Sequence, residues 1–74
     1  MKDKKWSMII GCNIDDHRRE MGLTHYRLGE LVGVGGKLIG RWCQGRHLPN
    51  VVALYRMSKI FGCTMEDLMR GVDV

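Results

Sequence analysis

Proline and long apolar runs are nearly absent from this chain of 74 residues, which contains a single proline and no low-complexity segment. A membrane-spanning helix needs about 20 consecutive apolar residues, whereas the apolar residues here are scattered at helical spacing. The basic start is followed by an apolar stretch, residues 6–12, that is too short for a signal peptide and is soon broken by Asn13 and Asp15. We therefore expect a cytoplasmic protein.

Cysteine is also scarce, and its spacing gives no motif. The three cysteines, Cys12, Cys43 and Cys63, are far apart and form no Cys-x-x-Cys pair. An odd number of cysteines in a reducing compartment argues against a disulfide framework, so we expect buried free thiols. A zinc site would need a ligand spacing that the cysteines and histidines lack, so we expect no metal and no cofactor. The histidines are His17, His25 and His47.

The short length excludes several function classes. A chain of 74 residues forms one domain at most, here residues 1–74. Such a chain buries only about 60% of its unfolded surface, which leaves no room for a deep catalytic cleft. Asp15 and Asp16 are neighbouring carboxylates, but no His or Cys base lies at a helical spacing that would complete a site with them. We interpret His17 as a half-buried structural histidine and expect no enzyme activity.

Acidic residues are almost missing from the middle of the chain. Between Met21 and Cys63 there are six Lys or Arg residues and one acid, Glu30. The whole chain carries a formal charge of +4. A basic stretch of this kind suits a polyanionic partner such as nucleic acid, although charge alone leaves open a generic solvated basic face.

Apolar residues recur at intervals of three and four, and this periodicity predicts an all-α chain of about five short helices in a compact bundle. The predicted helices cover residues 7–21, 25–32, 36–44 and 51–61, and a fifth begins after Thr64. Four of them start at a residue that can cap a helix N-terminus: Ser7, Thr24, Asn50 and Thr64. Residues 1–6 are expected to form a flexible N-terminus.

The second and third predicted helices are joined by a tight glycine turn. Two helices linked by three or four residues cross at roughly 90–120°, and a close crossing needs a small residue, which Gly29 supplies. The turn also needs a residue that tolerates positive φ, which Gly33 supplies. Val34 and Ile39 then anchor the third helix. Its outer face carries Gly36, Lys37, Gly40, Arg41 and Gln44. A helix presented in this way fits a DNA major groove about 12 Å wide.

Residues at many fixed spacings resemble the Cro/cI-type helix-turn-helix family of phage and bacterial repressors, also called XRE-like or lambda-repressor-like. The resemblance runs from about residue 10 to residue 69. It rests on Gly22-Leu23-Thr24, Leu28, Glu30, Gly33-Val34, Ile39, Arg41-Trp42, Gly45, Pro49, Leu54, Lys59, Gly62 and Leu68. It implies a single domain with the helix-turn-helix at about residues 24–43. It also implies that the chain binds double-stranded DNA at the nucleoid as a homodimer and acts as a transcriptional repressor.

The resemblance also implies which residues meet the DNA. The base-reading positions it implies are Gly36, Lys37, Gly40 and Arg41, and the phosphate-contacting positions are His25, Gln44 and Arg46. Arginine can donate two hydrogen bonds to guanine O6 and N7, and lysine can donate to the same atoms or hold a phosphate. The two glycines have no side chain with which to read a base, so most direct readout falls to Lys37 and Arg41.

Some residues depart from the family pattern. Glycine inside a helix costs about 1 kcal/mol relative to alanine, and the third helix carries Gly36 and Gly40 in place of better helix formers. Family members often pair the arginine at position 18 with a glutamate at position 43, where this chain has Cys43. Because a buried unpaired arginine is costly, we expect Arg18 to reach solvent, another carboxylate or a DNA phosphate.

Because few side chains of the third helix can read bases, a second hypothesis stays open. An antitoxin-like or adaptor module with weak or lost sequence reading would fit a third helix rich in glycine and a surface that exposes Leu31 and Leu38. Binding to duplex DNA that falls steeply with salt would distinguish the DNA reader from the adaptor. The expected dimer surface is the fifth helix together with the apolar residues Trp6, Met8 and Ile9.

Overall fold

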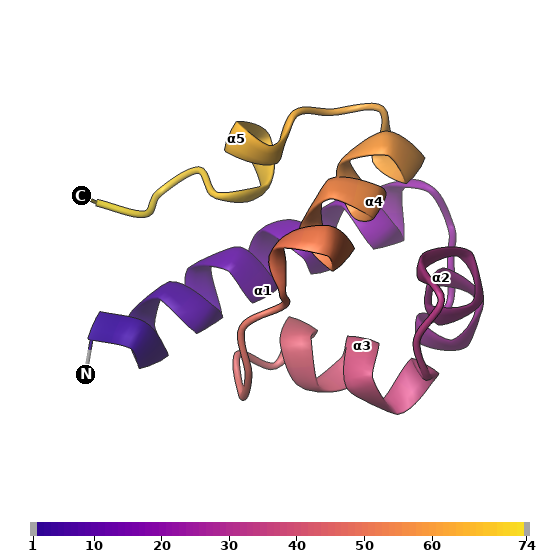
Figure 1. The fold of residues 1–74 in the computed structure, drawn as a ribbon, viewed down its shortest axis with the longest axis horizontal. Coiled ribbons are helices and arrows are strands. Elements are labelled where there is room, and N and C mark those ends of the chain that lie inside the picture. Colours follow the sequence, from indigo (N-terminus) through magenta and orange to yellow (C-terminus); the bar gives the residue numbers. More distant parts are fainter. Residues whose placement is uncertain (1, 74) are drawn as a thin grey trace.

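The computed structural model describes residues 2–73, with side chains from Lys5 onward, and contains helices and no strand within these residues. The helices are α1 (Lys2–Glu20), α2 (His25–Val32), α3 (Gly36–Cys43), α4 (Val51–Phe61) and α5 (Met65–Leu68). Helix α1 runs through the domain, with α4 and α5 on one side and α3 on the other, and α2 lies near the end of α1 (Figure 1). This arrangement confirms the expected all-α, five-helix bundle.

Helix α1 begins earlier than the sequence predicts. It starts at Lys2, so the predicted start and N-cap at Ser7 are wrong. Ser7 is instead buried inside the helix. The predicted flexible segment is helical over residues 2–6, and Met1 lies outside the described residues. The extended part of α1 also contacts the other end of the chain, since the Trp6 indole Nε1 donates a hydrogen bond to Asp73 Oδ1 at 3.3 Å.

Helices α2, α4 and α5 each begin directly after the capping residue that the sequence predicts. The Thr24 hydroxyl accepts a hydrogen bond from the backbone N–H of Arg27, and the Asn50 side chain accepts one from Ala53. At Thr64 the side-chain and backbone bonds with Asp67 form a complete capping box. Three of the four predicted N-caps are therefore confirmed.

The buried core joins residues from all five helices. Its apolar members are Ile10, Ile14, Leu28, Val32, Ile39, Trp42, Ala53, Leu54, Met57 and Leu68. Leu31 is exposed because α2 buries the face that bears Leu28 and Val32, four residues apart. Leu38, in contrast, is partly buried and packs against the core. Met69, at the C-cap of α5, is exposed.

The structure confirms the sequence-based expectation for His17 and contradicts the one for the cysteines. All three cysteines are free, but none is fully buried: Cys12 is exposed, and Cys43 and Cys63 are partly exposed. The expectation of buried thiols is therefore wrong, because these residues lie at the rim of the core. His17 stacks on Phe61 with ring centroids 5.2 Å apart, which confirms its structural role. No helix within residues 2–73 has the length and hydropathy that a membrane span requires.

Candidate nucleic-acid interface

The turn between α2 and α3 brings the two helices into backbone contact. A Cβ atom built on Gly29 would lie 2.6 Å from the Val34 carbonyl oxygen, so no larger residue fits without moving the turn. Gly33 adopts φ 94°, and its N–H donates to the Gly29 carbonyl at 2.8 Å. Both glycines thus do what the sequence predicts, and they fix how α3 is presented.

The outer face of α3 lines a shallow hollow on the protein surface. The residues lining this hollow are His25, Tyr26, Gly35, Gly36, Lys37, Gly40, Arg41, Gln44 and Arg46. All seven positions that the resemblance assigns to DNA contact are in this set, brought together from the start of α2, the length of α3 and the loop that follows. The ionisable lining residues are basic apart from Tyr26, and this gives the hollow the electrostatic character of an anion-binding surface.

The glycines of this face have different surroundings. A Cβ on Gly36 would lie 2.8 Å from the Cα of Tyr26, whereas a Cβ on Gly40 would have no neighbour nearer than the His25 ring at 3.9 Å. Nothing lies within 4 Å of a Cβ on Gly35. Gly36 therefore allows α3 to approach the first turn of α2, while Gly40 is open toward the hollow.

Tyr26 belongs to this surface although the sequence analysis did not single it out. Its side chain is 70% exposed and stands beside Gly36 in the first turn of α2. An aromatic residue two positions after a capping threonine, Thr24, is the signal that could have found it. A tyrosine in this position offers a hydroxyl that can donate to a phosphate oxygen.

A cluster of charged side chains from α1 lies beside the hollow. Arg18 donates from Nε and Nη2 to Asp15 Oδ1 at 3.1 and 2.9 Å, and from Nη1 to the Leu23 carbonyl at 2.6 Å. The exposed Arg19 adds an ion pair with Asp15 Oδ2 at 3.0 Å. Of the three expected partners of Arg18, the structure thus selects another carboxylate. Arg18 also satisfies a backbone carbonyl just before the helix-turn-helix begins.

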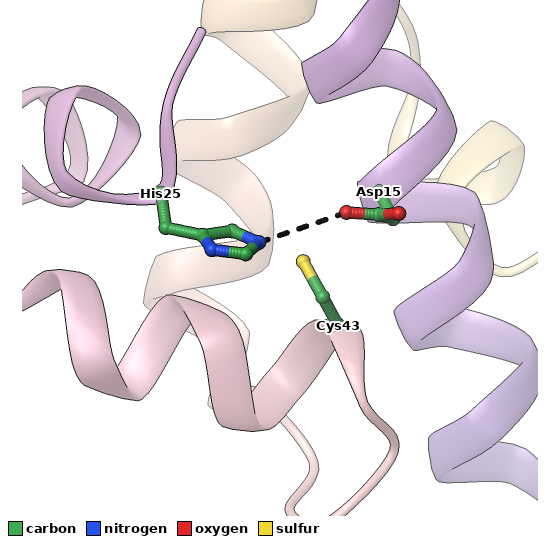
Figure 2. A group of neighbouring side chains, drawn as sticks. All are labelled: Asp15, His25 and Cys43. Atoms are coloured by element: carbon green, nitrogen blue, oxygen red, sulfur yellow. Dashed lines mark ion pairs between the residues drawn. The ribbon is translucent and has the colours of Figure 1, made fainter.

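Three side chains from separate segments meet at this cluster (Figure 2). The donor atoms of Asp15, His25 and Cys43 all lie within 4.8 Å of one another, and His25 Nε2 is 3.8 Å from Asp15 Oδ1. Burial raises the pKa of Asp15, but the hydrogen bonds and charge of Arg18 outweigh burial and hold the pKa below its ordinary value. Sequence spacing could not reveal this group, because its members come from α1, α2 and α3.

The same three residue types occur in cysteine-based catalytic triads, but the chemistry here is different. Burial and the neighbouring Asp15 charge raise the pKa of the Cys43 thiol to about 11. A nucleophilic cysteine needs a lowered pKa, because the thiolate is the reactive form. The arrangement therefore keeps the thiol protonated and does not support nucleophilic catalysis.

Comparison with known proteins identifies the family of this chain. The helix-turn-helix family model matches residues 14–68, which is most of the chain and includes α2, the turn and α3. The chain belongs to the helix-turn-helix family. This finding confirms the resemblance to Cro/cI-type proteins that the sequence motifs indicated.

Two similar proteins bear on regulation. Over 49 residues the chain is 37% identical to an uncharacterised HTH-type transcriptional regulator of Methanothermobacter thermautotrophicus, covering 66% of this chain and 71% of that protein. The structure of the P22 c2 repressor with a synthetic operator matches with a TM-score of 0.80 and 28% identity, covering 85% of this chain and 96% of that one. The curated P22 repressor sequence is longer, and the chain spans 30% of it.

The fold is also found inside an enzyme. Hydroxypropylphosphonic acid epoxidase from S. wedmorenis matches with a TM-score of 0.80 and 21% identity, covering 89% of this chain but only 35% of the epoxidase. At this identity the likeness concerns the fold alone. The match therefore shows that the fold can be one part of a larger protein, and it assigns no reaction to this chain.

Proposed function

We propose that this chain binds double-stranded DNA sequence-specifically and acts as a small transcriptional regulator, a repressor in the cytoplasm. The observation that carries the proposal is the basic hollow on α3, which collects all seven expected DNA-contacting residues in a chain of the helix-turn-helix family. The similarity to a repressor solved with its operator supports the same function. No step of this function requires catalysis, and we propose no enzyme activity.

In the proposed complex α3 lies in the major groove. Arg41 and Lys37 read base edges, because both side chains are exposed on the face that also bears Gly36 and Gly40. Gly40, which is open toward the hollow, contributes by letting the α3 backbone stand close to the bases. Two residues therefore carry most of the direct readout.

Phosphate contacts frame the reading helix in this proposal. His25, Gln44 and Arg46 are exposed and line the hollow, so each can meet a phosphate of the DNA backbone beside the groove. We add Tyr26 to this set because its exposed side chain lines the same hollow. These contacts position α3 but carry no sequence information themselves.

We further propose that the protein acts as a homodimer on DNA. Helix-turn-helix readers commonly pair on half-sites about 34–36 Å apart. Of the expected dimer surface, Trp6 and Met65 line an apolar hollow, whose other lining residues are Ile10, Leu48, Pro49, Val51, Leu54, Met69 and Val72. An apolar surface of this kind favours association with a second copy.

Selection of bound sites from random duplex DNA tests the proposal. We expect one enriched sequence with two inverted half-sites, and an affinity that falls steeply when salt is raised. An enriched single half-site would keep the DNA reader and overturn the dimer. If no sequence is enriched and mixed duplex DNA does not bind at low salt, the DNA proposal is wrong and the adaptor hypothesis takes its place.

A further inference from the structure

The cluster of Asp15, His25 and Cys43 has a donor set that is unusual for a purely structural contact. A carboxylate oxygen, an imidazole nitrogen and a sulfur atom converge within 4.8 Å (Figure 2). Imidazole and thiolate are ligands of zinc and related transition metals, whereas magnesium and calcium prefer oxygen alone. The donor set therefore selects one chemical class of ion.

The distances are close to those of a metal site. Zinc bonds of about 2.0 Å to nitrogen or oxygen and about 2.3 Å to sulfur place tetrahedral donors roughly 3.3–3.6 Å apart. His25 Nε2 and Asp15 Oδ1 are 3.8 Å apart, and no pair in the group exceeds 4.8 Å. Rotation of the imidazole, which is 45% exposed, can close the remaining gap.

The surroundings hold the three donors in place. His25 is the first residue of α2 and Cys43 the last residue of α3, while Asp15 lies within α1. Arg18 orients the carboxylate through two hydrogen bonds to Oδ1, as partners of metal-ligating carboxylates commonly do. His25 already directs Nε2 toward Asp15 and Cys43 (Figure 2), and Gly40 carries no side chain beside the His25 ring.

We propose that Asp15, His25 and Cys43 form a site for one zinc-type divalent cation, with water as the fourth ligand. The thiol proton of Cys43 is released to solvent when the sulfur binds the metal. Because this proton must leave, metal affinity rises with pH. The positive charges of Arg18 and Arg19 oppose the cation, so the site is weaker than a structural zinc site.

The position of the site gives it a regulatory role, an inference that rests on the proposed function. His25 is also a proposed phosphate contact at the edge of the DNA-binding hollow. A metal that holds the imidazole toward Asp15 and Cys43 removes this contact from DNA. Metal binding therefore weakens DNA binding, and DNA binding weakens metal binding to the same degree.

Cobalt binding tests the site without DNA. Co²⁺ added to the whole protein is expected to give a thiolate-to-metal absorption band that Zn²⁺ abolishes by displacement. The band should disappear in Cys43→Ser and in His25→Gln. It should persist in the matched controls Cys63→Ser, whose thiol is also partly exposed, and His47→Gln. Circular dichroism establishes that each variant is folded, and the exposed His25 keeps the test valid if Cys43→Ser unfolds.

A charge variant sharpens the test. Arg19 is 71% exposed and pairs with Asp15 Oδ2, so Arg19→Ala should tighten Co²⁺ binding several-fold without unfolding the protein. The proposal is overturned if the wild type gives no thiolate band, or if the band survives in both Cys43→Ser and His25→Gln. Loss of the band in Cys63→Ser alone would place the metal elsewhere and also contradict it.

Titration of a selected duplex with and without Zn²⁺ tests the regulatory part. Zinc should weaken binding several-fold in the wild type and leave Cys43→Ser unchanged. A cobalt band without any DNA binding would retain the metal site and overturn the proposed function. Equal effects of zinc on the wild type and on Cys43→Ser would overturn the regulation while retaining the site.

Discussion

Gly36 and Gly40 lie one turn apart on α3, but the space around them differs. The neighbouring backbone excludes a side chain at Gly36, whereas a side chain would fit at Gly40. At Gly36 the backbone of Tyr26 occupies the place of a Cβ, as Val34 and the turn do at Gly29. At Gly40 the corresponding space is open apart from the His25 ring. The inner glycines build the contact between α2 and α3, whereas Gly40 leaves the outer face bare. Glycines of one helix therefore serve two different purposes: Gly36 permits close packing of α3 against α2, and Gly40 leaves the outer face of α3 open.

The junction between α2 and α3 should respond most strongly to substitution. Gly29→Ala is expected to lower the free energy of unfolding by about 2–3 kcal/mol, because the added methyl meets the Val34 carbonyl and the turn backbone rather than a movable side chain. Urea denaturation measures the loss. An unchanged midpoint would show that the turn can yield, and it would remove the distinction between junction and surface.

On the outer face, the largest effect should concern DNA and not stability. Arg41→Ala is expected to cost about 1–3 kcal/mol of affinity for the selected duplex and much less for mixed duplex. Fluorescence anisotropy with both duplexes measures the difference. The matched control is Arg70→Ala, which removes the same charge from a site outside the hollow, where Arg70 pairs with Asp67. Equal losses on both duplexes would refute base reading by Arg41.

The two α3 glycines give the most direct contrast in stability. Gly36→Ala should destabilise the fold by about 1–2 kcal/mol, because its methyl meets the Tyr26 backbone. Gly40→Ala should stabilise it by up to about 1 kcal/mol, since alanine is the better helix former and the space is open. Thermal unfolding of both variants decides the matter. Shifts of the same sign would break the comparison.

The smallest expected effect is a pH dependence at the cluster beside the hollow. The folded protein raises the pKa of Cys43 from its ordinary value of 9.0 to about 11, mainly through burial. A raised pKa means that the protonated thiol favours folding, so this contribution is present below pH 9 and is lost as pH rises through about 11. Urea midpoints in this range should fall more steeply for the wild type than for Cys43→Ala. Parallel slopes would contradict the shift.

Local chemistry made much of the fold predictable. Thr24, Asn50 and Thr64 cap helices where the sequence places them, and Gly29 and Gly33 shape the turn as expected. Each of these features depends on neighbours within a few residues. The α3 residues of the proposed DNA-binding hollow were also predictable, because α3 has a regular period and one outer face, while His25 and Arg46 were implied by the family resemblance.

Other features depend on segments far apart in the chain, and sequence patterns could not give them. The hydrogen bond between Trp6 and Asp73 joins the two ends of the chain, 67 residues apart. The convergence of Asp15 and Cys43 requires the packing of α1 against α3. Likewise, Gly36 and Gly40 are the same residue in the same helix, and only their three-dimensional neighbours distinguish them.

Backbone amide chemical shifts measured during titration with the selected duplex test whether DNA binds at α3, since they report where the DNA lies along the chain. We expect the largest changes at His25 and Tyr26 and over residues 36–46, with small changes in α5. Changes concentrated in α5 and the first turns of α1, with α3 unaffected, would contradict this expectation.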